Sequence, residues 1–302
     1  MPSVRFARNS IFSLCLISSL LAGSVAGAVV GGQAVSVGDL IRRSIVEISG
    51  PGCSGVVIGD RMVLTASHCT AELSLLVVIL KSSLYRDCSH ARVDDVFYPP
   101  DEKSISIDGQ DWPTPDLAVI RLQTPLCGAK PAALSSEPLT AGRIVRTAGY
   151  SEGLWNGREA DWTRVRILRS DTNLLVHLFS NPKPNAERLR QMIQAEVPVF
   201  NFARPVKDDE AVCKGDSGGP VYTESGGQVS IYGVTSGILS DPKIGNRKCD
   251  GSLIQLVVPI QLERKWILST IRNPANSPAT GRRFGVPGER MNRALPQHSS
   301  NR

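Results

Sequence analysis

Short runs of apolar residues alternate along this chain with clusters of glycine, proline, aspartate and serine. The runs are rich in valine and isoleucine, which favour extended backbone, and the clusters between them are typical of turns. This pattern predicts an all-β protein whose many short strands form a sandwich or a barrel. The clearest predicted strands are Val56–Ile58, Arg61–Thr65, Leu75–Leu80, Leu117–Leu122, Ile144–Ala148, Val229–Val234 and Leu253–Val258.

Two stretches have the periodicity of a helix instead. One begins near Asn185, a residue that caps helices well, and carries Leu189, Met192 and Ile193 on one side. The other is predicted from about Ile260 to Ile271, because isoleucines recur there at helical spacing.

The two ends of the chain differ from the middle. Residues 1–28 have a basic start, an apolar stretch from Ile11 to Leu21 and the A-x-A site Ala26-Gly27-Ala28, which together predict a secretory signal peptide. A membrane anchor is the alternative, but the apolar stretch is short for a span. Residues 272–302 hold few large apolar side chains, and we expect a disordered basic tail. Such a tail either tethers the protein to an anionic surface or is simply solvated, and we favour the second interpretation.

Charge and length narrow the class of protein. The chain has 302 residues and a formal net charge of +6, and the hydrophobic fraction of 41% suffices for one large or two moderate domains. Residues 1–28 contain arginines and no acid, and residues 272–302 contain six arginines against one acid. The positive charge therefore sits at the ends, and we do not expect a nucleic-acid-binding surface on the folded part.

Cysteine usage indicates an oxidising compartment. The sequence holds seven cysteines, of which Cys15 lies in the predicted signal peptide, and no C-x-x-C pair. A zinc ribbon or thioredoxin-type site is therefore disfavoured, and three disulfides in an extracellular or periplasmic protein are expected.

The strongest chemical signal is the octet Cys213-Lys214-Gly215-Asp216-Ser217-Gly218-Gly219-Pro220. Glycines on both sides of a serine allow a reacting carbonyl to approach its hydroxyl. The amides of Gly215 and Ser217 would form a hollow for the oxyanion of a tetrahedral intermediate. A tight glycine-rich turn is the structural alternative.

The octet also contains the G-x-S-x-G elbow of α/β-hydrolases, but that fold places its histidine after the serine. Only His298 follows Ser217, and the alternating helices of an α/β sheet are missing from the pattern.

A serine nucleophile needs a base and an orienting acid. His68 follows the apolar run Val63-Leu64-Thr65 and precedes Cys69, and a Cys53–Cys69 disulfide would anchor its loop. Asp116 directly precedes an apolar strand, where a carboxylate is costly unless it is paired. We therefore propose His68, Asp116 and Ser217 as the catalytic residues. The remaining histidines are interpreted as structural or surface residues, and the acids of the polar loop near Asp116 as solvated: His90, His177, His298, Asp108 and Asp111.

At this point the sequence resembles the trypsin/chymotrypsin-type serine proteases. The matching segments occur in the family's order over nearly all of residues 29–271. They are Val29-Val30-Gly31-Gly32, Cys53-Ser54-Gly55, Thr65-Ala66-Ser67-His68-Cys69, Asp116-Leu117-Ala118-Val119, Gly215-Asp216-Ser217-Gly218-Gly219-Pro220 and Tyr232-Gly233-Val234-Thr235-Ser236-Gly237.

The resemblance implies two packed, six-stranded antiparallel β-barrels, over residues 29–140 and 141–271, with a C-terminal helix and the active site between the barrels. It implies that Ser217 is the nucleophile, His68 the general base and Asp116 its orienter, with Gly215 and Ser217 supplying the oxyanion amides. It also implies a Cys213–Cys249 disulfide, which leaves Cys88 to pair with Cys127.

The resemblance further implies an activation switch in which a freed amine at Val29 pairs with the buried carboxylate of Asp216. Cleavage after Ala28 would expose Val29 directly, so signal removal itself would make the active N-terminus. Cleavage after Ala26, followed by trimming, is the competing possibility.

The expected specificity pocket departs from that of trypsins. Ala211 stands where trypsins carry the aspartate that binds basic side chains, and Gly237 stands in place of the usual tryptophan after Ser236. A pocket formed by Ala211, Val212, Ser236, Gly237 and Ile238 would favour small or apolar side chains over arginine and lysine.

The sequence thus predicts a secreted serine endopeptidase that works through an acyl-enzyme. A non-catalytic, protease-like binding protein and a serine esterase on the same fold are the alternatives. We expect a monomer that acts on protein or peptide substrates, with a protein inhibitor as a candidate partner. No nucleic acid, stable membrane anchor, cofactor or dedicated metal site is expected.

Overall fold

The structure is a computed structural model, and it describes residue 29 and residues 31–71, 76–81, 86–107, 110–150, 160–168, 201–207, 210–240 and 252–273. The predicted signal peptide, the helix near Asn185, Cys249 and nearly all of the basic tail lie outside the described residues.

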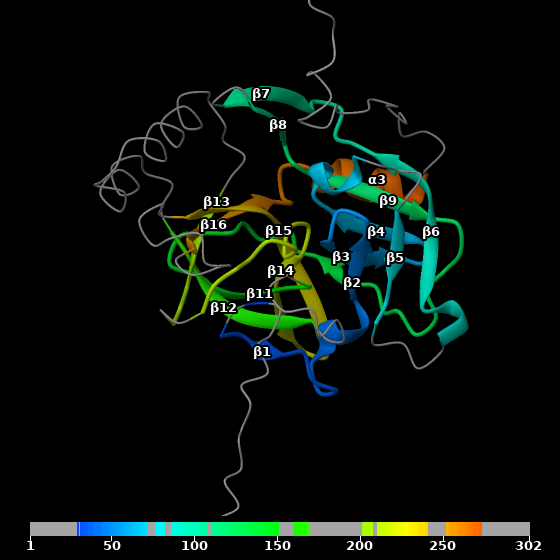
Figure 1. Cartoon of the computed structure of the whole chain (residues 1–302), viewed down its shortest axis with the longest axis horizontal. Coiled ribbons are helices and arrows are strands. Elements are labelled where there is room, and N and C mark those ends of the chain that lie inside the picture. The colour runs from blue at the N-terminus through cyan, green and yellow to red at the C-terminus, as the bar shows by residue number, and fades with distance from the viewer. Residues whose placement is uncertain are drawn as a thin grey trace, which may run out of the picture.

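Six antiparallel strands close the first barrel, in the order β2-β3-β4-β9-β6-β5 (Figure 1). Fully buried Ile48 and Val78 are cross-strand partners on one face of these strands, and so are fully buried Val63 and Ile120. These residues come from the short Val/Ile-rich runs, because alternate side chains of a strand point to the same face. The strands are β2 (Ile45–Ser49), β3 (Cys53–Gly59), β4 (Met62–Thr65), β5 (Val77–Ile79), β6 (His90–Phe97) and β9 (Ala118–Leu122).

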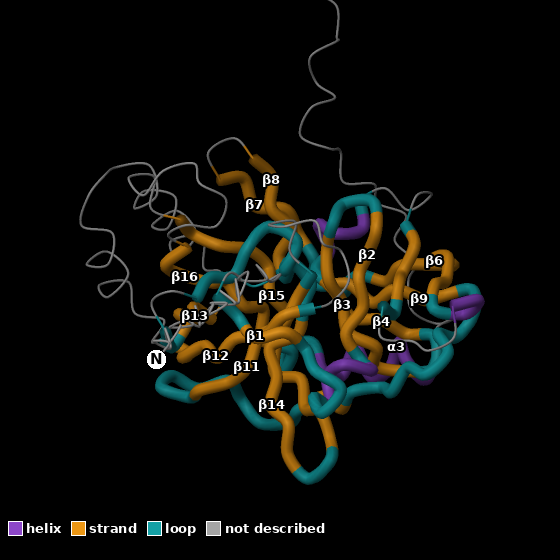
Figure 2. Tube along the Cα trace, turned by 60° about the horizontal axis from the view of Figure 1, so that its bottom comes forward, coloured by secondary structure: helices purple, strands orange, loops and turns teal. Residues whose placement is uncertain are grey.

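The second barrel is built from six strands of the other half of the chain, in the order β12-β11-β14-β15-β16-β13, and β13 pairs with β12 to close it. Figure 2 shows the two barrels side by side. The strands are β11 (Ile144–Gly149), β12 (Asp161–Ile167), β13 (Asn201–Pro205), β14 (Pro220–Ser225), β15 (Gln228–Ser240) and β16 (Ser252–Pro259). The prediction of two six-stranded antiparallel barrels is confirmed, and each of the predicted strands overlaps an observed one.

Several short strands and 3-10 helices lie outside the two barrels. Strand β1 (Gln33–Ala34) pairs with β12, and β10 (Ala133–Leu134) runs parallel to β15. The hairpin of β7 (Lys103–Ile107) and β8 (Gln110–Thr114) rises from one end of the molecule in both views (Figures 1 and 2). Three 3-10 helices occur among the described residues, namely η1 (Leu40–Arg43), η2 (Ser67–Thr70) and η4 (Arg86–Cys88).

The C-terminal helix α3 (Arg264–Arg272) starts later than the predicted Ile260. Ile260 directly follows β16 and is still held to β15, because its amide donates to the carbonyl of Tyr232 at 3.0 Å. Glu263 N then donates to Ile260 O at 3.1 Å, which forms the turn that leads into the helix. Ile267 is fully buried, and Trp266 and Ile271 pack against the large hydrophobic cluster, so the amphipathic pattern was correct although the start was wrong.

Candidate active site

Asp116 is completely buried just before strand β9. Its carboxylate accepts hydrogen bonds from Ser67 Oγ at 3.0 Å, His68 N at 3.0 Å, His68 Nδ1 at 2.8 Å and Ser236 Oγ at 2.5 Å. Burial raises the pKa of this carboxyl, but the adjacent imidazole and the hydrogen bonds from His68 and Ser236 outweigh burial and lower it. The acid is therefore held ionised in a site from which water is excluded.

His68 lies on η2, directly after strand β4. Because Asp116 accepts from Nδ1, the neutral ring carries its proton on Nδ1 and leaves the Nε2 lone pair free. Burial disfavours the imidazolium, but the charge and hydrogen bond of Asp116 outweigh burial and raise the pKa of His68 above 6.5. The side chain is 34% exposed, so its outer edge is accessible to a substrate.

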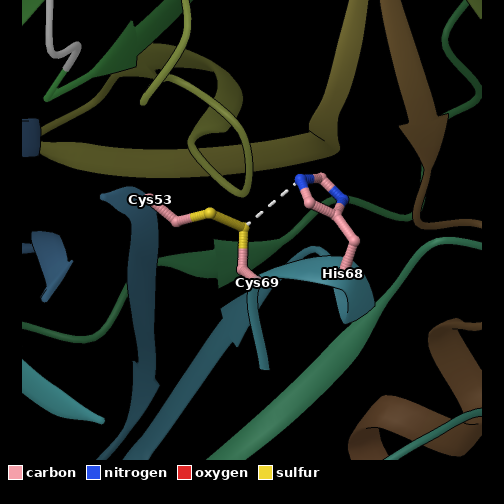
Figure 3. A group of neighbouring side chains, drawn as sticks. All are labelled: Cys53, His68 and Cys69. Atoms are coloured by element: carbon pink, nitrogen blue, oxygen red, sulfur yellow. Dashed lines mark hydrogen bonds between the residues drawn. A yellow bond between two sulfur atoms is a disulfide. The ribbon is translucent and has the colours of Figure 1, made fainter. Parts of the chain in front are cut away.

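A disulfide holds the loop that carries His68. Cys53 at the start of β3 is bonded to Cys69, with the Cα atoms 6.0 Å apart, and His68 Nε2 lies 3.6 Å from Cys69 Sγ (Figure 3). Among the described residues, Cys53, His68 and Cys69 are the only three potential metal ligands that are close enough to share one ion. Both sulfurs are consumed by the disulfide and are not thiolates, so this group does not form a metal site.

Ser217 lies in a tight loop before strand β14. Gly215 and Gly218 have positive φ angles of 101° and 81°, and a Cβ on Gly218 would lie 2.2 Å from Ser54 O. Only glycine fits this position, because the neighbouring backbone cannot move away.

The same loop is fixed by hydrogen bonds to both barrels. Ser54 of β3 donates from its amide to Ser217 O at 2.8 Å and from its hydroxyl to Gly215 O at 2.8 Å. Gly218 N donates to Thr235 O of β15 at 2.7 Å. The amides of Gly215 and Ser217 donate to no described residue, so both remain available to a bound group.

Ser236 connects the predicted nucleophile to the predicted acid. Its carbonyl accepts a hydrogen bond from Ser217 Oγ at 3.3 Å, and its own hydroxyl bonds to Asp116. Within the described part of the chain, Ser217 Oγ and His68 form no hydrogen bond, although Cys69 Sγ lies within 3.7 Å of both His68 Nε2 and Ser217 O. The structure therefore brings the three residues into one site, with the serine hydroxyl turned toward Ser236.

Asp216, beside Ser217, is 1% exposed. Cys213 N donates to its Oδ2 at 2.8 Å, while its buried Oδ1 has no hydrogen-bond partner among the described residues. Burial raises the pKa of Asp216 well above its ordinary value; the Cys213 amide lowers it, and the charge of Asp161 adds to the rise. A buried carboxylate without a partner is costly, so Oδ1 can accept a further donor.

Val29 is fully buried in the same region. It packs against Gly32, whose amide donates to Val29 O at 2.8 Å, and a Cβ on Gly32 would lie 3.0 Å from Trp162 O. Trp162 follows Asp161, which pairs with Gly149, and a Cβ on Gly149 would lie 2.2 Å from Asp216 Oδ1. Val29, the predicted N-terminus, and Asp216, its predicted partner, therefore both lie beside the pair of strands β11 and β12.

Of the residues expected to form the specificity pocket, Ala211, Val212 and Ser236 are buried, whereas Gly237 and Ile238 are partly exposed. The disulfides Cys53–Cys69 and Cys88–Cys127 are confirmed. Cys213 is also disulfide-bonded, but its expected partner Cys249 lies outside the described residues. His90 is exposed, as expected of a surface residue, and His177 and His298 lie outside the described residues.

Sequence reasoning missed two polar residues near the site. Ser67 donates to Asp116, and its position next to His68 was the available signal. Gln255 is 2% exposed on β16, and the signal was a single amide within the apolar run Leu253–Val258.

The helices of the described part of the chain include none that is long and apolar enough to cross a lipid bilayer.

Comparisons with known proteins agree with this geometry. The trypsin family model matches residues 29–267. Snake venom serine protease 3 of Protobothrops flavoviridis is 26% identical over 215 residues, which cover 68% of this chain and 76% of that protein. Coagulation factor XI of Bos taurus is 23% identical over 266 residues, which cover 86% of this chain and 40% of that protein. Among solved structures, neuropsin, a serine protease of mouse brain, superposes with a TM-score of 0.55 at 20% identity, covering 80% of this chain and 98% of that chain, and so shares its fold.

Proposed function

This chain belongs to the trypsin family, and we propose that it is a secreted serine endopeptidase whose catalytic residues are His68, Asp116 and Ser217. The observation that carries the proposal is the buried Asp116 carboxylate. It accepts from His68 Nδ1 at 2.8 Å and so presents Nε2 as the base. A fully buried aspartate that accepts four hydrogen bonds, two of them from the same histidine, is typical of an acid that orients a catalytic base.

The reaction begins when a substrate carbonyl enters beside Ser217. The hydroxyl rotates away from Ser236 O toward His68 Nε2, which takes its proton as Oγ attacks the carbonyl carbon. The amides of Gly215 and Ser217 stabilise the oxyanion of the tetrahedral intermediate. His68 then protonates the leaving amine as the peptide C–N bond breaks, and an acyl-enzyme remains on Ser217. Neutral His68 next takes a proton from water as the water oxygen attacks the acyl carbon, and it returns this proton to Ser217 Oγ as the ester bond breaks and the acid product leaves.

Apo geometry of this kind is compatible with catalysis, because hydrogen bonds between base and nucleophile often tighten only in the substrate complex. The Asp116 charge also stabilises the imidazolium that forms during attack, which is the same effect that raises the pKa of His68.

Activation is proposed to follow release of the amine of Val29, which would then bind the unpartnered Oδ1 of Asp216. Removal of the predicted signal peptide after Ala28 would release this amine without a separate propeptide. Support comes from the burial of Val29 and from the missing partner of Asp216 Oδ1.

For the substrate, we propose small or apolar residues rather than arginine or lysine, because the neutral Ala211 occupies the position expected at the base of the pocket. We further propose that the protein acts as a monomer on protein or peptide substrates. The relatives include proteins named for snake venom and for blood coagulation, which supports secretion.

The proposal is tested by labelling the secreted protein with a fluorophosphonate and by measuring cleavage of a peptide library. Wild-type protein should label at Ser217 and cleave peptides, and Ser217→Ala should lose both activities. Ser269→Ala, which removes an exposed hydroxyl on α3, is the matched control and should keep both. Labelling without peptide cleavage would favour an esterase, and the absence of labelling in correctly matured protein would favour a non-catalytic binding protein.

A further inference from the structure

The outer face of the second barrel carries arginines at neighbouring positions of two strands. Arg166 on β12 is directly opposite Arg204 on β13, and Arg164 lies two residues before Arg166 on the same strand. All three are exposed. Both views place β12 and β13 on the side of this barrel that lies away from the first barrel (Figures 1 and 2). We call Arg164, Arg166 and Arg204 the arginine patch.

The strand register fixes the direction of these side chains. Val165 and Ile167, which alternate with the two arginines of β12, are buried in the core of the second barrel. Successive side chains of a strand point to opposite faces, so the two arginines of β12 point outward. Ala203, the cross-strand partner of Ile167, is also buried, which places the arginine of β13 on the outer face. The three side chains of the patch therefore leave the same face of the sheet.

The charges of the arginine patch are not balanced by acids of the same sheet face. The other outward residue of β12 in this region is Trp162, and β11 presents exposed Ile144 opposite Arg166. Arg164 and Arg166 form no ion pair with another residue in the described part of the chain. Like charges at directly opposed positions destabilise a sheet, so the patch lowers stability unless an anionic partner covers it.

A neighbouring arginine on the same face has such partners within the chain. Arg146 on β11 is the cross-strand partner of Arg164. Its Nη1 lies 3.0 Å from Glu224 Oε2 and 3.5 Å from Asp39 Oδ1, and its guanidinium lies 4.1 Å from the centre of the Trp162 ring. Both acids are therefore used by Arg146, and the arginine patch begins where this internal pairing ends.

We propose that the arginine patch binds an extended acidic segment of another protein. Guanidinium groups bind carboxylates through two parallel hydrogen bonds. Alternate side chains of an extended chain lie about 7 Å apart, both in β12 and in an extended peptide. Acidic residues at alternate positions of such a peptide would therefore each meet one arginine of β12, and Arg204 on the adjacent strand would bind a further carboxylate.

Ile144 favours a protein segment over a sulfated polysaccharide. This side chain is 43% exposed and lies directly opposite Arg166, so an apolar group stands beside the charges. An apolar side chain of a peptide would cover it, and arginine beside apolar surface is typical of protein–protein interfaces. A polyanionic sugar chain offers no comparable apolar group. The inference goes beyond the proposed function and does not depend on it, because none of the proposed catalytic residues takes part.

The test measures binding of a fluorescently labelled peptide that has glutamate at alternate positions and a central leucine. Each protein is the full chain with Ser217→Ala, so that it cannot cleave the peptide. Adding Arg164→Gln and Arg166→Gln together should raise the Kd by at least about tenfold, the loss expected for two hydrogen bonds between charged groups. Adding Arg61→Gln and Arg92→Gln removes the same charge from exposed positions of the first barrel and should change the Kd by less than about twofold.

Thermal unfolding shows that the compared proteins are folded, and a peptide with lysine in place of glutamate should not bind. Equal affinity of the patch variant and its parent for the acidic peptide overturns the inference. Binding of heparin or of phosphatidylserine vesicles without binding of the acidic peptide also overturns it, because the partner would then be a polysaccharide or a membrane. Every protein compared lacks the Ser217 hydroxyl, so failure of this inference leaves the proposed function intact.

Discussion

Replacing Asp216 with asparagine should have opposite effects on stability in the two N-terminal forms of this protein. The forms to compare begin at Val29 and at Gly27, so they differ only in whether the amine of Val29 is free. In the extended form, buried Asp216 Oδ1 lacks a partner among the described residues, whereas the free amine is proposed to pair with it in the mature form. The substitution therefore removes an uncompensated charge in one form and half of an ion pair in the other.

The magnitudes follow from the environment of the carboxylate. In the mature form, Asp216→Asn leaves a buried ammonium unpaired and should cost about 3–5 kcal/mol. In the extended form, asparagine can still accept from Cys213 N, a bond of 2.8 Å in the native chain, and should stabilise the protein at neutral pH by about 1–3 kcal/mol.

The effect should depend on pH with a definite sign. The pKa of Asp216 is raised in the extended form, so its contribution to stability is present below its ordinary pKa of 3.8 and is lost as pH rises. The extended wild type should therefore lose stability between about pH 4 and pH 7, and its Asp216→Asn variant should lose less.

The assay is denaturant unfolding of all four proteins at pH 4 and pH 7, with exposed Asp60→Asn as the control substitution. The control should change the free energy of unfolding by less than about 0.5 kcal/mol in either form. Equal effects of Asp216→Asn in the extended and mature forms would refute the pairing of Val29 with Asp216.

Further predictions concern the catalytic residues and their support. Asp116→Asn should lower kcat by about 10⁴-fold, because asparagine stabilises the wrong tautomer of His68. The measurement is kcat per titrated active site, and a loss of less than about tenfold would argue against the triad. In a pH profile of kcat/KM, the rate should rise with pH as His68 loses its proton. Ser67→Ala should move this rise to higher pH, because Asp116 would lose a hydrogen-bond donor and stabilise the imidazolium of His68 more strongly. A rise that stays at the same pH or moves to lower pH contradicts this role of Ser67. Gly149→Ala should abolish labelling of Ser217 and lower the melting temperature, because the new Cβ would lie 2.2 Å from Asp216 Oδ1; normal labelling would show that the loop can yield. Replacing Cys53 and Cys69 by alanine should cost about 3 kcal/mol of unfolding free energy, the value for a loop of about 15 residues, and reduce kcat, whereas unchanged values would show that the His68 loop is held by other contacts.

The strand pattern was readable because the strands consist of short Val/Ile-rich runs that are bounded by turn residues. The run Ile144–Ala148 is one example, and β11 (Ile144–Gly149) overlaps the prediction closely. The helix start was less readable. Ile260 has the spacing of the helix, but its amide is used by Tyr232 of another strand, a contact that no local pattern shows.

Some residues of the candidate site could also be predicted from their sequence neighbours, and others could not. His68 and Ser217 are flanked by distinctive small residues, glycines and cysteines, so their sequence neighbourhoods suggest their chemistry. Ser236 lies in a strand without a distinctive motif, and its hydrogen bonds to Ser217 and Asp116 depend on segments far away in the chain.

The sequence by itself determined the all-β character and the identity of the candidate catalytic residues, because these depend on local composition or on distinctive short motifs. The pair Cys53–Cys69 was predicted beside the His68 motif, whereas Cys88–Cys127 followed only by elimination after the family resemblance, and both pairs are confirmed. Only the tertiary structure decided that Asp116 is held by Ser67, His68 and Ser236 together, and that the hydroxyl of Ser217 turns toward Ser236. It also decided that the buried amide of Gln255 on β16 donates to Thr147 on β11 and to Thr235 on β15. The physical reason is that burial and hydrogen-bond partners are set by how segments far apart in the chain pack together. For residues on strands, such as Ser236 and Gln255, a one-residue shift in register would turn the side chain to the opposite face.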